Sequence, residues 1–266
     1  MRAAALLCLI ALAAGCAPEF DEEQLVKDLR ILGIRAEPPE LRLGGPTPSI
    51  AVDALVVDPT APDRLHDWEL WLCSADGPLC DAASASALLR RDRTRLDQIR
   101  HSLVLDEEML RQAHELYPQL DWIPLTLELR VLQEQGPTVR GVKRLRLLGS
   151  TAELRAQNPR ITTIKQGGAL LGGPIPLAPC REVTLSIWLL DPGQGVSLDL
   201  YTSRGAADLT SPPLDMSTFD FPNLAVAWDP CSSSGPPTGG SAFLWLVLRD
   251  GMGGIDWAEV QATLSP

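Results

Sequence analysis

Short runs of branched and aliphatic residues, separated by proline, glycine and aspartate, recur along the chain from residue 29 to its end. In the first half they include SIAVDALVVDP, HDWELWLC and PLTLELRVL, and in the second half EVTLSIWLLDP, LAVAWDP and AFLWLVLRD. Runs of this length and composition, bounded by turn residues, are typical of β-strands. Their close spacing is that of an all-β sandwich. We therefore expect a mainly all-β protein.

Two turns can be placed within this pattern. Gln135-Gly136-Pro137 separates strand-like runs at residues 126–132 and 142–148, which predicts a hairpin with one buried face. The glycine-rich stretch at residues 250–254 also lies between two strand-like runs. Because no helix-like segment follows it, this stretch cannot present a phosphate to a helix N-terminus, and we expect a second hairpin turn.

Residues 84–117 interrupt the strand pattern with helical periodicity. Four apolar residues are spaced by seven, three and four positions, which places them on one helical stripe: Leu89, Leu96, Ile99 and Leu103. Asp106 can cap a second helix. We expect a helical insertion that covers an edge or end of the first sandwich, or alternatively contacts a partner. The basic residues within it would form a solvated helix face: Arg90, Arg91, Arg93 and Arg95.

A polar stretch at residues 151–160, which contains Asn158-Pro159, divides the strand-rich parts of the chain. A chain of 266 residues, of which 45% are hydrophobic, can bury the cores of one or two domains. We therefore expect one β domain at residues 29–150, a linker at 151–160 and a second β domain at 161–266.

The first residues, MRAAALLCLIALAAGC, combine one positive charge, a short apolar run and then small residues. This layout is typical of a secretion signal, so we expect residues 1–15 to be removed. The apolar run is too short to cross a bilayer core, which needs roughly 20 residues.

The end of this segment, Leu12-Ala13-Ala14-Gly15-Cys16, resembles a bacterial lipobox. The resemblance implies a lipid-modified Cys16 as the new N-terminus, the lipid bilayer as a partner, and residues 16–28 as a lipidated acidic tether. Because Ala17 is not aspartate, analogy with the sorting of such lipoproteins favours the outer membrane. The alternative is an ordinary cleavage after Ala13, which would release a soluble protein.

The number of cysteines favours lipid modification of Cys16 over simple secretion. Simple secretion would leave an odd number of cysteines in an oxidising compartment, whereas acylation of Cys16 leaves four: Cys73, Cys80, Cys180 and Cys231. Three connectivities are open, and we favour Cys73–Cys80 with Cys180–Cys231 because both bridges then fall inside a predicted domain. The spacing lacks the patterns of a zinc site.

Three segments, RAEPPE at 35–40, WLC at 71–73 and RDGMGGIDW at 249–257, resemble parts of uncharacterised lipoproteins of myxobacteria. The resemblance implies two immunoglobulin-like β-sandwich domains. It carries no catalytic residue to this chain.

Chemistry-bearing residues are sparse. The formal net charge of −11 makes nucleic acid an improbable partner, since binding a phosphate backbone requires a clustered cationic face. There is no G-x-S-x-G motif, and the position after His114-Glu115 that a zinc protease would need as histidine is Pro118. We expect surface histidines and no catalytic residue, metal site or cofactor.

Tryptophans offer the one further signal. Trp71, Trp188 and Trp245 lie within apolar runs and are expected in the core, whereas Trp68 and Trp257 alternate with charged residues, so the pattern assigns them to neither core nor surface. The function we expect is that of a non-catalytic envelope lipoprotein that contacts another envelope protein or has a structural role. Two alternatives remain open: a carbohydrate-binding envelope module with coplanar exposed tryptophans, and an unrecognised hydrolase.

Overall fold

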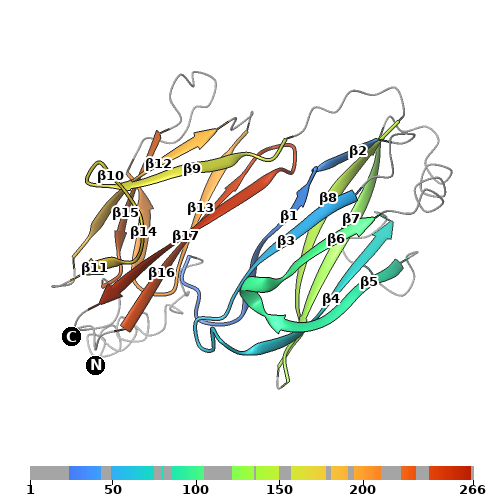
Figure 1. The fold of residues 1–266 in the computed structure, drawn as a ribbon, viewed down its shortest axis with the longest axis horizontal. Helices are drawn as coiled ribbons and strands as arrows, with labels where there is room; N and C mark the ends of the chain where they lie inside the picture. Colours follow the sequence, from blue (N-terminus) through green and yellow to red (C-terminus); the bar gives the residue numbers. More distant parts are fainter. Residues whose placement is uncertain are drawn as a thin grey trace, which may run out of the picture.

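The computed structural model describes residues 24–42, 49–74, 80, 86–104, 122–134, 136–149, 157–177, 181–190, 195–210, 223–231 and 240–264. Within these ranges the elements are β-strands and one short 3-10 turn, η1 (Leu96–Gln98). The strands form four sheets (Figure 1). No helix among the described residues is long and apolar enough to cross a membrane.

Two sheets form the N-terminal sheet pair. The three-stranded sheet has the order β1-β3-β6, from β1 (Arg30–Glu37), β3 (Ser49–Val57) and β6 (Arg100–Val104). The five-stranded sheet has the order β2-β8-β7-β4-β5, from β2 (Glu40–Arg42), β4 (Leu65–Ser74), β5 (Ser86–Arg95), β7 (Trp122–Leu132) and β8 (Val139–Leu148).

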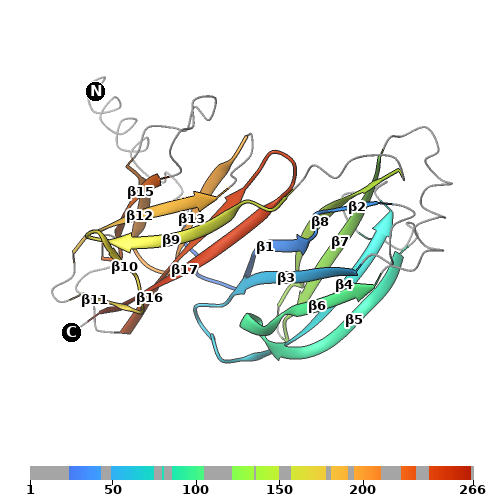
Figure 2. The ribbon, with the colours of Figure 1, turned by 45° about the horizontal axis from the view of Figure 1, so that its top comes forward.

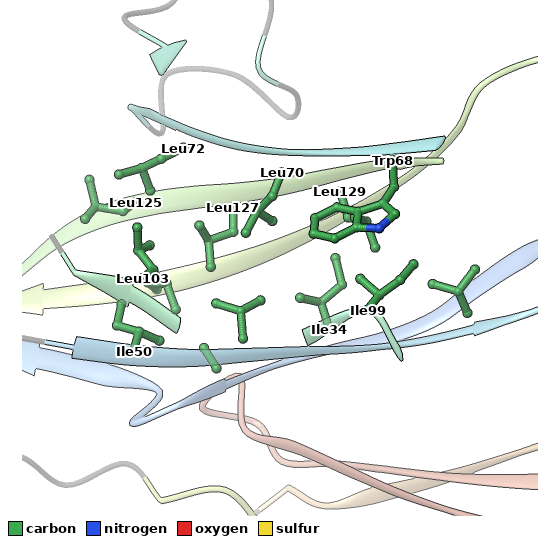
Figure 3. Close-up of a cluster of buried hydrophobic side chains, with 14 of the residues drawn as sticks. Ile34, Ile50, Trp68, Leu70, Leu72, Ile99, Leu103, Leu125, Leu127 and Leu129 are labelled. Atoms are coloured by element: carbon green, nitrogen blue, oxygen red, sulfur yellow. The ribbon is translucent and has the colours of Figure 1, made fainter. Parts of the chain in front are cut away.

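The core of this pair follows from strand alternation, because successive side chains point to opposite faces of a sheet. Trp68, Leu70 and Leu72 of β4 lie on the inner face and are buried. They point toward Ile34 and Ile50 of the opposite sheet (Figure 3). The apolar residues of every second position thus make one continuous core.

The C-terminal sheet pair repeats this layered arrangement (Figure 2). A five-stranded sheet has the order β10-β9-β12-β15-β14, from β9 (Arg160–Gln166), β10 (Ala169–Leu170), β12 (Val183–Leu190), β14 (Ala206–Leu209) and β15 (Asn223–Asp229). A four-stranded sheet has the order β11-β17-β16-β13, from β11 (Ile175–Leu177), β13 (Ser197–Thr202), β16 (Gly240–Arg249) and β17 (Ile255–Leu264). Its own core includes Leu185, Trp228 and Leu244, which are fully buried. The expectation of an almost all-β protein built of packed sheets is confirmed.

The predicted helical insertion is wrong where the structure describes it, since residues 86–104 form β5, η1 and β6. The helical stripe nevertheless identified core residues: Leu96, Ile99 and Leu103 are buried, and Leu89 packs against them. A register shift in the pairing of β4 with β5 skips Leu89, and η1 then resets the strand phase. These two irregularities produce a helix-like spacing within strands. Residues 105–117 lie outside the described residues.

Both predicted hairpins are confirmed. β7 and β8 pair in antiparallel register from Trp122 with Leu148 to Val131 with Val139. β16 and β17 pair likewise around residues 250–254. There Gly253 has a φ of 94°, a conformation that favours glycine.

The chain enters the fold through the C-terminal sheet pair. Leu25 forms a parallel bridge with Thr202 at the end of β13. The backbone N–H of Val26 donates to the carbonyl of Thr202, and the N–H of Thr202 donates to the carbonyl of Gln24, both at 2.8 Å. Val26 is fully buried. The last residues of the predicted tether therefore belong to the folded body.

Candidate functional site

The two sheet pairs meet at a junction with a small apolar cluster of its own. Its buried members come from both halves of the chain: Val26, Leu32, Val57, Trp245, Val247 and Ile255. Gly33 allows the close approach, because a Cβ atom there would lie only 2.7 Å from Cδ1 of Ile255. The junction is packed as a core, which limits sliding of one pair against the other.

Arg35 is the polar centre of this junction. Its guanidinium lies 2.8 Å from Asp53 in β3 and 2.6 Å from Asp256 in β17. It also lies over the ring of Trp257, 4.7 Å from the ring centroid. One cation thereby joins carboxylates of both sheet pairs.

Asn158 makes a second connection. Its Nδ2 donates to the carbonyl of Ala36 and to Oε2 of Glu37, both at 2.7 Å, while its Oδ1 accepts from the N–H of Ile255 at 3.0 Å. The peptide bond between Glu37 and Pro38 is cis. The sequence segments 35–40 and 249–257, far apart in the chain, therefore meet here.

Lys143 lies beside this junction, in a hollow of about 290 Å³ between β1, β8 and the turn after β16. The side chain is buried, and Nζ donates to the carbonyl of Gly253. Burial lowers the pKa of Lys143 to about 8, with Asp250 opposing the shift and Arg249 adding to it. Arg249 itself donates to the carbonyl of Leu32 at 2.7 Å.

Asp250 and Asp256, at the two sides of the glycine-rich turn, are both engaged by partners within the protein. Oδ1 of Asp250 accepts the N–H groups of Met252 and Gly254, and so closes the hairpin turn. The carboxylate of Asp256 accepts hydrogen bonds from Arg35 and from the backbone N–H of Ile161. Within the described ranges no group of His, Cys, Asp and Glu side chains could hold a metal ion.

Of the predicted cysteine sites, the Cys73–Cys80 disulfide is confirmed, with a Cα–Cα separation of 5.5 Å. Cys231 is also disulfide-bonded. Cys180, its predicted partner, and Cys16, the predicted lipid site, lie outside the described residues, so both assignments stay predictions.

His66 corrects the expectation of surface histidines. It is buried, and its Nε2 lies 3.7 Å from Oδ2 of Asp58. Burial lowers the pKa of His66, while Asp58 opposes the shift. Asp58 meanwhile accepts hydrogen bonds from Thr60, so it closes a turn after β3. His114 lies outside the described residues.

The outer side of the five-stranded N-terminal sheet carries a charged surface that the sequence did not predict. Alternation and strand pairing bring seven arginines of β5, β7 and β8 to this side, and we call them the arginine face: Arg91, Arg93, Arg95, Arg130, Arg140, Arg144 and Arg146. The stripe of arginines on β5 is therefore a solvated strand face rather than the expected helix face. It lies on an edge strand, where charge discourages unwanted strand pairing.

Carboxylates lie beneath these arginines. Glu128 is fully buried, 2.8 Å from Nε of Arg130 and 3.6 Å from Nη1 of Arg140. It also accepts the N–H of Cys80 at 2.6 Å, so the disulfide loop is fastened to the sheet.

Glu69 is the second buried carboxylate of this face and pairs with Arg91. Burial acts to raise the pKa of Glu69, but hydrogen bonds from Trp71 and Arg91 outweigh it and lower the pKa. Glu69 is therefore held in its charged form at neutral pH.

The tryptophans correct a further expectation. Trp68 is buried in the core, whereas Trp71 lies on the outer side, 4.8 Å beneath the guanidinium of Arg130. Trp122, Trp188 and Trp257 also lie next to cationic side chains. All seven tryptophans lie within the described residues, and only Trp122 is exposed. The two coplanar exposed tryptophans that the carbohydrate-binding alternative predicts are not found among the described residues.

Comparison with known proteins identifies no family. No family model matches the chain. No curated protein matches it.

Solved structures give only distant similarities. The two tandem V-type regions of VCBP3, a v-region-containing chitin binding protein, share 10% identity over 89% of this chain and 100% of that chain, with a TM-score of 0.33. Alpha-2-macroglobulin of E. coli shares 10% identity over 92% of this chain but 17% of that protein, with a TM-score of 0.28. Zebrafish RET cadherin-like domains 1 to 4 share 10% identity over 76% of this chain and 41% of that chain, with a TM-score of 0.24. At these scores the similarities carry no functional argument.

Proposed function

We propose that this chain is a non-catalytic lipoprotein of the bacterial cell envelope, with two immunoglobulin-like sandwiches that act as one structural or protein-binding body. The junction is the observation that carries this proposal. Arg35, Asp53, Asp256 and Asn158 are used to bind the two halves to each other. Each of these polar groups has a hydrogen-bond or ion-pair partner within the protein, so together they hold the two sheet pairs in one fixed arrangement.

Anchoring through lipid at Cys16 is the second part of the proposal, and the lipobox-like residues 12–16 together with the cysteine parity support it. Only eight positions separate Cys16 from Gln24, the first described residue. Fully extended, such a segment spans at most about 28 Å. A lipid at Cys16 would therefore hold the β13 end of the junction close to the bilayer. Several acyl chains are needed for firm attachment, because one chain binds only marginally.

The lipid is tested by membrane fractionation and mass spectrometry in cells that make the full chain. Cys16→Ala should move the protein from the alkali-resistant membrane fraction to the soluble fraction. Cys8→Ala is the matched control, because Cys8 lies within the predicted signal and should leave fractionation unchanged. Unaltered membrane retention of Cys16→Ala, or an unmodified thiol on the native N-terminal peptide, would refute the anchoring proposal.

Placement in the outer membrane follows from the same proposal. It is supported by Ala17 at the position that follows the lipidated cysteine.

A further inference from the structure

We infer that the arginine face docks an acidic protein surface in which apolar side chains are interleaved. This inference rests on the protein-binding role proposed above and is independent of lipid attachment. It begins from composition: the outer side of this sheet carries the seven arginines of β5, β7 and β8, a further arginine on β2 (Arg42) and two tryptophans, but no lysine. Arginine and tryptophan are enriched at the centres of protein interfaces, whereas lysine is depleted there.

On this face the negative charges lie buried near the sheet and the positive charges lie above them, exposed to solvent. Three of its carboxylates are buried at the level of the sheet: Glu40, Glu69 and Glu128. The arginines above them are accessible, with Arg91 66% and Arg140 44% exposed. An approaching partner therefore meets guanidinium groups, and the buried carboxylates keep several of them in fixed orientations. A guanidinium fixed in this way loses less side-chain entropy when a second carboxylate binds it.

Other arginines have only weak internal partners. Arg93 lies 3.5 Å from Glu134, and Arg95 lies 3.8 Å from Asp63, and both of these acids are more than 80% exposed. Exposed ion pairs contribute roughly 0–1 kcal/mol each, so a partner can replace them at little cost. Arg144 is exposed and forms no ion pair with the described residues.

Apolar side chains complete the surface. Four of the exposed large hydrophobic residues lie on this same outer side: Leu65, Leu88, Trp122 and Val142. Val142 stands between Arg140 and Arg144 on β8, and Leu65 is opposite Arg95. Alternating cationic and apolar groups match a protein surface that alternates carboxylates with apolar side chains.

Other occupants fit this face less well. A two-fold contact between copies would place arginines against arginines, which is repulsive. Nucleic acid and anionic lipid headgroups offer phosphates but no apolar side chains to cover Leu88 and Val142. The four acids on the face, including Asp67, also limit its net positive charge. An acidic protein satisfies both the charge and the apolar groups.

The test is site-specific crosslinking in cells that produce the full chain. A photoreactive phenylalanine analogue replaces Val142, and a control copy carries it at Leu190, an exposed residue of the C-terminal sheet pair. We expect a protein adduct from position 142, with an acid-rich crosslinked segment in the partner, and none from position 190. Charge reversal by Arg93→Glu with Arg144→Glu should lower the adduct yield by roughly tenfold. Arg160→Glu with Arg181→Glu changes net charge equally on the other sheet pair and should preserve it.

Several results would overturn the inference. They are a folded protein that gives no protein adduct at position 142, an adduct whose yield is the same after both charge reversals, and an adduct formed with lipid alone. Purified protein is also titrated with phosphatidylglycerol vesicles and with duplex DNA. Binding of either that is lost in Arg93→Glu/Arg144→Glu but kept in the control would reassign the face to phosphates. Lipid attachment is measured separately by fractionation, so failure here leaves the anchoring proposal standing.

Discussion

Burial of the Lys143 ammonium group should lower the free energy of unfolding by an amount that depends on pH. Its ammonium group is buried beside the junction, and its pKa of about 8 lies below the usual value of 10.5. Between these two values the unfolded chain binds more protons than the folded chain. The free energy of unfolding should therefore rise as the pH rises from about 8 to about 10.5, and the penalty should be fully present below pH 8.

Lys143→Met is expected to remove this dependence and to raise the free energy of unfolding at pH 7 by roughly 1–3 kcal/mol. Urea denaturation at pH 7 and pH 10 measures both effects. Lys165→Met, on the outside of the C-terminal sheet pair, serves as the control and should keep the wild-type dependence on pH. An unchanged pH slope in Lys143→Met would show that another group is responsible.

The disulfide loop shows what joins elements of the five-stranded sheet. Cys73 lies on the outer side near the end of β4, and the backbone N–H of Cys80 donates to Glu128 on the same side of β7. Replacing both cysteines, Cys73→Ala with Cys80→Ala, should lower the free energy of unfolding by about 2.5 kcal/mol, on the chain-entropy account of a loop of this length. Urea denaturation of the double variant provides the measurement. A loss below about 0.5 kcal/mol would mean that the bridge adds little to the fold.

Strand pattern explains which elements could be predicted from the sequence. The two hairpins were predictable because each turn lies between runs with clear periodicity. β5 and β6 were mistaken for a helix because a register shift and a 3-10 turn together imitate helical spacing. Alternation alone would have reversed the assignments of Trp68 and Trp71, since Trp68 shares its face with Leu70 and Leu72.

The arginine face illustrates what sequence could not supply. Arginine at every second position of β5, and again at 144 and 146 of β8, marks one side of each strand. The neighbours across the sheet depend on strand order, which brings β4 and β7 between them. Net charge gave no sign of this surface, because a chain of formal charge −11 can still have its cationic side chains clustered on one side. The expectation that nucleic acid is an improbable partner was drawn from total charge, and it stays a prediction.

At the scale of the whole molecule, the junction determines whether the two sheet pairs behave as one body. Arg35→Ala leaves Asp53 and Asp256 without their shared cation. We expect the wild type to unfold in one transition and Arg35→Ala to unfold in two, because the link between the halves is weakened. Calorimetry measures the transitions, and X-ray scattering should show a larger radius of gyration.

The control for this prediction is Arg100→Ala. Arg100 also approaches Asp53, at 3.6 Å, but it is 79% exposed and makes no contact with Asp256 in the described structure. This variant should unfold as the wild type does. One cooperative transition in Arg35→Ala, with an unchanged midpoint, would show that apolar packing alone holds the halves together.

The entry of the chain beside Thr202 has a mechanical consequence. Residues 24–26 pair with the end of β13 before the chain turns into β1. Tension applied at the amino end of residues 24–26 is therefore delivered first to the end of β13 in the C-terminal half of the molecule. Until the hydrogen bonds to Thr202 break, the load enters the fold at the end of β13, and β1 is not peeled directly from its sheet.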